Sequence, residues 1–355
     1  MSRNSIGWLR ATVAVVAVLG SATGSALIVA TGPAAANPTL DRGLTNHVVQ
    51  GTGTLTAIAC HGTTTCEAVG EAFTSTSPIG GVVSITNGVP GPVEQVPGPA
   101  ELFGIACPRA TICEAVGAGY AVAVKGGTPE TAVAVAGIDL YGVACPTTTT
   151  CVAVGVELQS GKVLGGAVVP ITDGKPGTPV VLKGTMELLG VACVDATTCE
   201  AVGWEVKNLR GGGVVVPIIN GIPGTSRMVR PTIGAFGGVA CPGATTCEAV
   251  GQNAATTRGA TMSIVGGTFG PQVVDASAGL FTGVACPSAA SCVAVGGSRS
   301  SPQKGVVAPI AGGSPGPAQV VLRTVLLNGI ACPGASTCEA VGESSSGKGV
   351  VVSLT

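Results

Sequence analysis

The sequence predicts an all-β fold: a seven-bladed β-propeller with four-stranded antiparallel blades, closed by the N-terminal strand. Three observations predict it. A cysteine-bearing unit repeats seven times, the composition suits buried sheets, and a strand missing from the last unit occurs just before the first. Successive units begin 38 to 48 residues apart, and propeller blades span about 40–50 residues.

The composition of the 355-residue chain favours sheets over helices. Charged residues make up 10%, against about 25% in ordinary soluble domains, and 57 residues are glycine. Abundant Val, Ala, Gly and Thr suit strands that are buried on both faces. The net charge of −1 offers no basic surface for nucleic acid.

Residues 1–36 have the pattern of a secretory signal peptide. Arg3 and Arg10 give a positive start, an apolar stretch covers residues 11–30, and the alanines at 34–36 form a cleavage site. The alternative is an uncleaved membrane anchor, because about 20 apolar residues can span a bilayer; polar and glycine residues within the stretch favour cleavage. We therefore predict a secreted or cell-surface protein with a signal peptide (1–36), a short linker (37–44) and a propeller (45–355).

All fourteen cysteines fall into seven pairs, each six positions apart. A pair on either side of a tight turn between antiparallel strands can bring its sulfurs within bonding distance, and an even count in an exported chain indicates disulfides. Zinc is the alternative, but the mature chain holds only His47 and His61 to complete a site. The predicted disulfides are Cys60–Cys66, Cys107–Cys113, Cys145–Cys151, Cys193–Cys199, Cys241–Cys247, Cys286–Cys292 and Cys332–Cys338.

Each unit contains four apolar runs separated by Gly, Pro, Asn and Asp, which predicts four strands. Counting back from the first cysteine, position −1 is Ala in all seven units, position −3 is Gly in six with Ala57 the exception, and position −5 is Leu or Phe. Since side chains alternate along a strand, we expect these three positions to share one face. Small residues there are expected to let neighbouring sheets meet at the axis.

The seventh unit stops after its third strand, residues 349–354. Residues 45–51 match the fourth strand at 178–184, and in both segments the final Gly lies nine residues before the first cysteine of the next unit. We therefore expect residues 45–51 to pair with 349–354 and close the ring, which removes exposed sheet edges.

The motif Leu-x-Gly-Val-Ala-Cys, followed by Cys-Glu-Ala-Val-Gly, resembles the repeat of sialidase-like propellers, especially that of photosystem II assembly factors. The resemblance covers residues 45–355 and implies a ligand face made by the loops between second and third strands and between blades. The Asp-box (Ser-x-Asp-x-Gly-x-x-Trp) is absent from every unit, and cysteines take the family's aromatic and Gly positions. Neither sialidase activity nor photosystem assembly is therefore carried over.

The sequence predicts no catalytic, metal-binding or cofactor-binding residue. A sialidase-type site needs clustered Arg and a Tyr nucleophile beside a Glu, but the arginines are scattered and the two tyrosines are Tyr120, in a short loop, and Tyr141, in a first strand. The alternative is a secreted, glycan-active hydrolase of sialidase-like type with an unrecognised site at the axis. Three or more convergent carboxylates or arginines around the channel would favour that alternative.

Five units carry Glu directly after their second cysteine, whereas two carry Val152 and Val293 there. A function that needs a full ring of carboxylates would not tolerate two valines. We therefore interpret these glutamates as structural, bonding backbone groups near the hairpin or a neighbouring blade. They are Glu67, Glu114, Glu200, Glu248 and Glu339.

The variable loops between second and third strands are the best ligand candidates, because they concentrate basic residues, whereas the turns between paired cysteines are mostly Thr, Ala, Ser and Gly. We expect a monomeric, non-catalytic binding or scaffold protein whose partner is an unknown protein, or a glycan or other anionic surface polymer. Solvated loops without a ligand are the alternative. The candidate ligand-binding residues are Lys162, Trp204, Lys207, Arg210, Arg258, Arg299 and Lys304.

Overall fold

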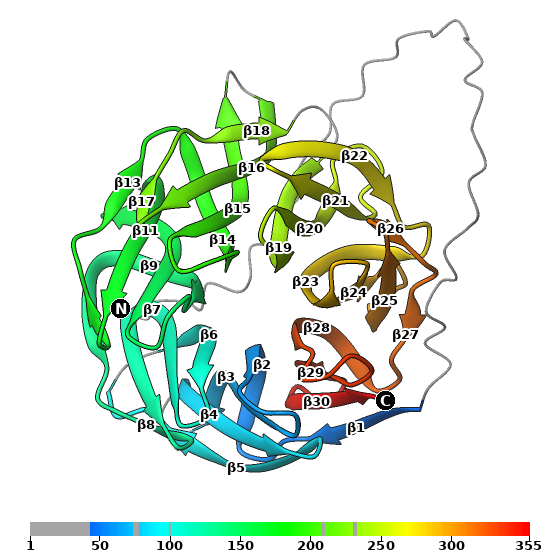
Figure 1. Cartoon of the computed structure of the whole chain (residues 1–355). Helices are drawn as coiled ribbons and strands as arrows, with labels where there is room; N and C mark the ends of the chain where they lie inside the picture. The colour runs from blue at the N-terminus through cyan, green and yellow to red at the C-terminus, as the bar shows by residue number, and fades with distance from the viewer. Residues whose placement is uncertain (1–42, 74–77, 99–100, 208–209, 230–232) are drawn as a thin grey trace, which may run out of the picture. The chain divides into compact units, whose positions relative to one another are not determined.

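The computed structural model describes residues 43–73, 78–98, 101–207, 210–229 and 233–355, so the predicted signal peptide and nearly all of the linker lie outside the described residues. The described residues belong to one unit, Ala35–Thr355. Their strands form antiparallel sheets arranged as seven blades around a common axis (Figure 1), which confirms the predicted fold class. Among them, no helix is long and apolar enough to cross a membrane.

In blades 1, 5 and 7 four strands pair in the order first to fourth, with the first strand next to the axis (Figure 1). Blade 1 consists of β2 (Thr52–Cys60), β3 (Thr65–Phe73), β4 (Pro78–Thr86) and β5 (Val89–Gln95). Blade 5 consists of β19 (Ile233–Gly243), β20 (Thr246–Asn253), β21 (Gly259–Val265) and β22 (Thr268–Val274). Blade 7 consists of β28 (Thr324–Ala331), β29 (Cys338–Ser344), β30 (Gly349–Leu354) and β1 (Leu44–Val48).

In blades 3, 4 and 6 the fourth strand is divided into two short pieces, the first of which ends in Pro. In blade 3 the first strand is the end of β9 (Val133–Ala144). It is followed by β10 (Thr150–Gln159), β11 (Lys162–Thr172), β12 (Lys175–Pro176) and β13 (Val180–Leu182). Blade 4 has β14 (Thr185–Cys193), β15 (Thr198–Lys207), β16 (Arg210–Ile219), β17 (Ile222–Pro223) and β18 (Arg227–Val229). Blade 6 has β23 (Ala278–Ser288), β24 (Ser291–Ser298), β25 (Gly305–Ala311), β26 (Ser314–Pro315) and β27 (Gln319–Val320).

Blade 2 is the shortest, as its short repeat predicts. Strand β7 (Ile112–Lys125) supplies its second and third positions, since its first half pairs with β6 (Leu102–Arg109) and its end with β8 (Thr128–Pro129). Strand β9 (Val133–Ala144) runs from the outer position of blade 2 into the first strand of blade 3. The sheets of blades 2 and 3 are therefore continuous.

Strand β1 closes the ring. It pairs antiparallel with β30, which brings Leu44 opposite Leu354 and Val48 opposite Val350. The next residue, Val49, donates its N–H to the Gly349 carbonyl at 2.8 Å and packs its side chain in a cluster with residues of blade 1. The pairing predicted for residues 45–51 is confirmed over the range of β1.

All seven predicted disulfides are present, one in each blade, and no described cysteine is free. Each joins the first strand to the second across the cysteine turn; in blade 4 Cys193 and Cys199 are direct cross-strand partners. Loop-closure entropy for so short a loop corresponds to about 2 kcal/mol per bridge, in a model-dependent account. The bridges therefore hold the inner hairpin of each blade.

The first strand carries a bulge in every blade, and the bulge corrects one prediction. In blade 4 the register of β14 and β15 shifts between Leu188 and Gly190, which leaves Leu189 as the extra residue. An extra residue reverses the facing of the side chains after it. Leu188 therefore packs with residues of blade 3, whereas Gly190 faces blade 5. Positions −5 and −3 do not share a face.

Two sets of glycines make room for this arrangement. The glycine that ends each Ala-Val-Gly motif lies under the bulge: a Cβ added at Gly203 would lie 2.0 Å from the carbonyl oxygen of Glu187, and the other six blades give 1.5 to 2.2 Å. At position −3, a Cβ added at Gly104 would lie 2.8 Å from the carbonyl oxygen of Tyr141 in the next blade. Side chains larger than hydrogen would thus push apart strands that touch through their backbones.

We expect Gly203→Ala to destabilise the propeller, because the added methyl group would displace the backbone of β14 and not a flexible side chain. The loss of unfolding free energy should reach or exceed the about 1–3 kcal/mol typical of overpacked cores. Gly211→Ala is the matched control, since Gly211 is exposed and an added Cβ would lie 3.9 Å from its nearest neighbour. Equal urea midpoints for wild type and Gly203→Ala would contradict this role of the glycine.

Candidate functional site

Three acidic residues occupy one position in three successive blades. Glu101, Asp139 and Glu187 each lie six residues before the first cysteine of their blade. Their carbonyl oxygens lie over the glycine that ends the Ala-Val-Gly motif of the second strand, as that of Glu187 does over Gly203. The three residues therefore stand at the end of the blades where the loops between second and third strands begin.

Two further carboxylates reach the same level from second strands. Glu71 of β3 and Glu343 of β29 each follow the glycine that ends the Ala-Val-Gly motif. Burial raises the pKa of Glu71, a hydrogen bond with the Thr54 backbone opposes the rise, and the charges of Glu101 and Glu343 add to it. We call the set of five the acidic arc, which spans blades 7, 1, 2, 3 and 4. It comprises Glu71, Glu101, Asp139, Glu187 and Glu343.

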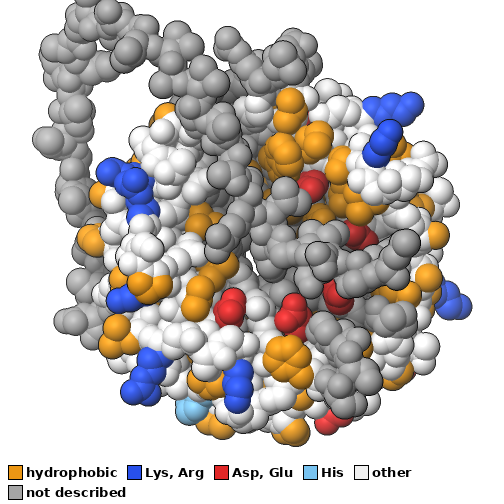
Figure 2. All heavy atoms as spheres, turned by 180° about the vertical axis from the view of Figure 1, so that it is seen from behind, with side chains coloured by type: hydrophobic (Ala, Val, Ile, Leu, Met, Phe, Trp, Pro, Cys, Tyr) orange, Lys and Arg blue, Asp and Glu red, His pale blue; other side chains and the backbone are white. Residues whose placement is uncertain are grey.

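Blades 5 and 6 contribute no residue to the acidic arc. The residues that correspond to Glu101 are uncharged in blades 5, 6 and 7, where they are Ala235, Leu280 and Leu326. Figure 2 shows one face of the ring, on which acidic side chains gather around the middle while Lys and Arg side chains lie toward the rim. The charge at the centre of this face is therefore negative.

An aromatic pair lies beside the arc. Phe103 and Tyr141 are the bulge residues of blades 2 and 3, and their ring centroids are 5.7 Å apart at an interplanar angle of 35°. Burial raises the pKa of the Tyr141 hydroxyl above its usual value of 10, and the charges of Glu187 and Asp139 raise it further. Burial and these two carboxylates therefore favour the neutral phenol of Tyr141.

In three other blades the bulge residue instead joins neighbouring blades. Thr56 donates to the carbonyl oxygen of Leu102 at 3.0 Å, and Asn328 donates to that of Leu55 at 2.8 Å. Thr282 donates to the carbonyl oxygen of Leu327 in the next blade at 2.6 Å. At the bulge position blades 2 and 3 thus carry aromatic rings, whereas blades 1, 6 and 7 carry a side chain that hydrogen-bonds to the next blade.

Trp204 connects the second strand of blade 4 to the arc. It lies opposite Glu187 across β14 and β15, and its indole N–H donates to Oε2 of Glu187 at 3.3 Å. Burial raises the pKa of Glu187, and this hydrogen bond opposes the rise. Trp204, predicted from the sequence as a ligand contact, is half-buried and lies beside the arc through this hydrogen bond.

The predicted basic contacts lie in or next to the loops between second and third strands. Lys162 begins β11, Arg258 precedes β21, and Arg299 and Lys304 flank the loop between second and third strands of blade 6. Lys162, Arg299 and Lys304 are exposed, and Arg258 is half-buried. The side chains of Lys207 and Arg210 lie outside the described residues. The ligand role of these residues stays a prediction.

The carboxylates of the arc have few charge partners. Among the described residues, no cation lies within salt-bridge distance of Glu71, Glu101, Glu187 or Glu343. In the same part of the chain, no three His, Cys, Asp or Glu side chains are close enough together to hold a metal ion. The five carboxylates are therefore spread around the axis and do not form a compact metal-binding site.

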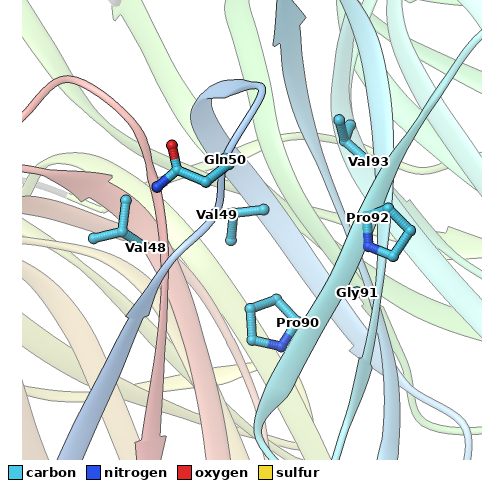
Figure 3. Close-up of a pocket in the computed structure, with 7 residues that line it drawn as sticks. All are labelled: Val48, Val49, Gln50, Pro90, Gly91, Pro92 and Val93. Carbon is cyan, nitrogen blue, oxygen red and sulfur yellow. The ribbon is translucent and has the colours of Figure 1, made fainter.

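A shallow groove of about 400 Å³ lies on the outer wall, between the closing strand and blade 1 (Figure 3). Its lining is mostly apolar, and its one side chain with hydrogen-bonding groups, Gln50, accepts a hydrogen bond from Lys348 at 2.6 Å. The groove contributes no charged side chain. The lining residues are Val48, Val49, Gln50, Pro90, Gly91, Pro92 and Val93.

No protein-family model and no curated protein sequence matches the chain. Among solved structures, the WD40 β-propeller domain of Doa1 matches 88% of this chain and 97% of its own, with a TM-score of 0.62 and 9% identity. YCF48 bound to D1 peptide matches 92% and 99%, with a TM-score of 0.57 and 11% identity. At such identities the likeness establishes the propeller fold alone; the sialidase-like relationship and secretion stay predictions.

A third match is Sqt1 of Chaetomium thermophilum bound to the N-terminus of the ribosomal protein L10. It covers 83% of this chain and 84% of its own, with a TM-score of 0.55 and 13% identity. Two of the three structures are thus propellers in complex with a polypeptide segment.

We expect the fluorescence of Trp204 to report the protonation of Glu187. In a Trp8→Phe variant Trp204 is the single tryptophan, and loss of the carboxylate acceptor should change its emission. Because the pKa of Glu187 is raised, the midpoint should lie above 4.5. Glu187→Gln should abolish the transition, whereas a transition that persists in this variant would assign it to another group.

Proposed function

We propose that the chain is a non-catalytic binding or scaffold propeller that holds a segment of another protein at the acidic arc. The observation that carries the proposal is the arc itself: five carboxylates from five adjacent blades, next to the Phe103–Tyr141 pair. Two of the propellers with the same fold are bound to a peptide or to the N-terminus of a protein. A polypeptide is therefore the class of partner that the observations support best.

The chemistry of the arc favours a partner segment that carries Lys or Arg. Carboxylates form strong, charge-assisted hydrogen bonds with these side chains. The faces of Phe103, Tyr141 and Trp204 can attract the same cations through their ring electrons. Such binding should weaken as salt rises, because at about 0.15 M ionic strength charges are screened over about 8 Å.

Glycan hydrolysis is the second candidate, and two observations favour it. The arc brings more than three carboxylates around the axis, which is the arrangement expected of this alternative. The pKa of Glu187 is raised by burial, as in a general acid, and Asp139 is a second carboxylate near Tyr141. Against it, no cation among the described residues lies within salt-bridge distance of Glu71, Glu101, Glu187 or Glu343, whereas a sialidase-type site needs clustered arginines to hold an acidic sugar. Binding without chemistry therefore accounts for more of what the site contains.

Localisation, oligomeric state and polymer binding are separate parts of this proposal. We propose that the protein is secreted or held at the cell surface and acts as a monomer. We also propose that the basic loops contribute to binding an anionic or carbohydrate polymer. Alanine replacement of Lys162, Arg258, Arg299 and Lys304 together tests the loops, with hyaluronate as the probe. Unchanged retention of hyaluronate by this variant would remove the polymer from the proposal.

The peptide proposal is tested with a capped eight-residue Lys-Gly peptide and a matched Glu-Gly peptide, measured by calorimetry against the wild-type protein. We expect binding of the Lys peptide only, weaker at higher salt. Glu101→Gln, Asp139→Asn and Glu187→Gln together should weaken it by at least about tenfold, or about 1.4 kcal/mol. Glu94→Gln, on the exposed face of β5, is the control. Equal affinity of the triple variant and wild type would overturn the proposal.

The hydrolase candidate requires a different readout from the same variants. Release of reducing sugar from a glycan panel by wild type, lost in Glu187→Gln, would assign catalysis to the arc. Peptide binding without sugar release leaves the binding proposal in place.

A further inference from the structure

The five glutamates that follow a second cysteine lie in the seams between blades. In four of these seams a glycine in the next blade's turn between third and fourth strands covers the carboxylate. A Cβ added at Gly174 would lie 3.7 Å from Oε2 of Glu114, and one at Gly313 would lie 3.7 Å from Oε2 of Glu248. The covering turns therefore leave these carboxylates little room.

Three of the five glutamates have a donor or a cation beside them. Ser84 donates to Glu67 at 2.8 Å, and Ser353 donates to Glu339 at 2.7 Å. Glu200 lies near an arginine whose charge opposes the rise in pKa that burial causes. The donors to the first two are serine hydroxyls, where the sequence led us to expect backbone groups.

Glu114 and Glu248 differ from the other three. Like Glu67 and Glu339 they are buried, with 6% and 5% of their surfaces exposed, but among the described residues neither has a donor or a cation beside it. Among the described residues, the buried Oε1 atom of each has no hydrogen-bond partner; Oε2 of Glu200 has none either, but there the charge of Arg227 opposes the effect of burial. An ionised carboxylate in such a place has lost water without gaining donors, so burial raises the pKa of Glu114 and Glu248 to about 7.

Few charged groups face these two side chains. Around Glu248, strands β19, β20, β21 and β25 and the covering turn at 312–314 contain no other Asp, Glu, Lys, Arg or His. Near Glu114, the charge of Glu130 adds to the effect of burial on the pKa, and Glu130 is itself paired with Lys125 at 2.6 Å. The other charged residues at the end of β6 and on the covering turn are exposed: Arg109, Asp173 and Lys175.

We propose that Glu114 and Glu248 make two seams of the ring responsive to pH, one between blades 2 and 3 and one between blades 5 and 6. A protonated carboxyl keeps the covering turn in place, because it needs no compensating cation. Ionisation leaves a buried charge without donors, and the turn loosens to admit water.

Folding raises the pKa of both carboxyls from 4.5 to about 7, so the folded protein binds these protons more tightly than the unfolded chain. Their contribution to stability is therefore fully present below pH about 4.5 and is lost as the pH rises through about 7. This direction is opposite to that of a carboxylate held by a salt bridge.

Thermal unfolding of the full chain at pH 5.5 and pH 8.5 tests the proposal. We expect the wild-type Tm to be lower at pH 8.5 by about 5 °C or more. Glu114→Gln with Glu248→Gln should lose most of that difference, since the amide mimics the protonated acid and only these two carboxyls are raised to about 7. Glu67→Gln, a variant at a seam where Ser84 supplies a donor, should keep the wild-type difference. A double variant that keeps that difference would overturn the proposal.

Hydrogen exchange localises the effect and needs no variant. In wild type, peptides that cover the turns at 172–176 and 311–315 should lose protection between pH 5.5 and pH 8.5, after correction for the intrinsic rate. The turn at 86–89, which covers Glu339 with its serine donor, should change less. Equal changes in all three turns would overturn the assignment to Glu114 and Glu248, whatever the variants do.

Discussion

The close approach of seven first strands around one axis is the constraint on which the other features depend. A Cβ added at Gly190 would lie 3.2 Å from the Cα of Gly238 in the next blade, so the two strands touch through their backbones. The bulge turns the apolar residue before it into the preceding seam, where Leu188 is fully buried. Each seam thus receives a large side chain from one blade and small residues from the other.

The same bulge places the candidate site. Its extra residue is free of the strand's alternation, and it is used in two ways. Thr56, Thr282 and Asn328 bond to the next blade, whereas Phe103 and Tyr141 stack on each other beside carboxylates. A ring of near-identical blades therefore gains a distinct side because some blades exchange a stabilising contact for an aromatic surface.

The fold could be predicted from the sequence because its signals are local. The cysteine spacing, the Ala-Val-Gly motif and the match of residues 45–51 to a fourth strand can each be read within one repeat. The bulge was not predicted, because Leu189 looks like any other strand residue. Strict alternation of side chains therefore placed Leu188 on the wrong face. Aligning the repeats would have revealed Glu101, Asp139 and Glu187 in one column. Their nearness to Glu71 and Glu343 depends on how blades meet around the ring, which no single repeat records.

The pairing of β1 with β30 has a consequence for biogenesis. Ribosomes deliver the N-terminal end first, so the strand that completes the final blade emerges before nearly everything it must join. The blades can form their hairpins and sulfur bridges one after another, while this segment waits without its partner. During that interval it can pair with the open edge of a second, nearly finished copy. A high local concentration during synthesis would therefore favour molecules linked through exchanged strands, and dilution would favour self-contained rings.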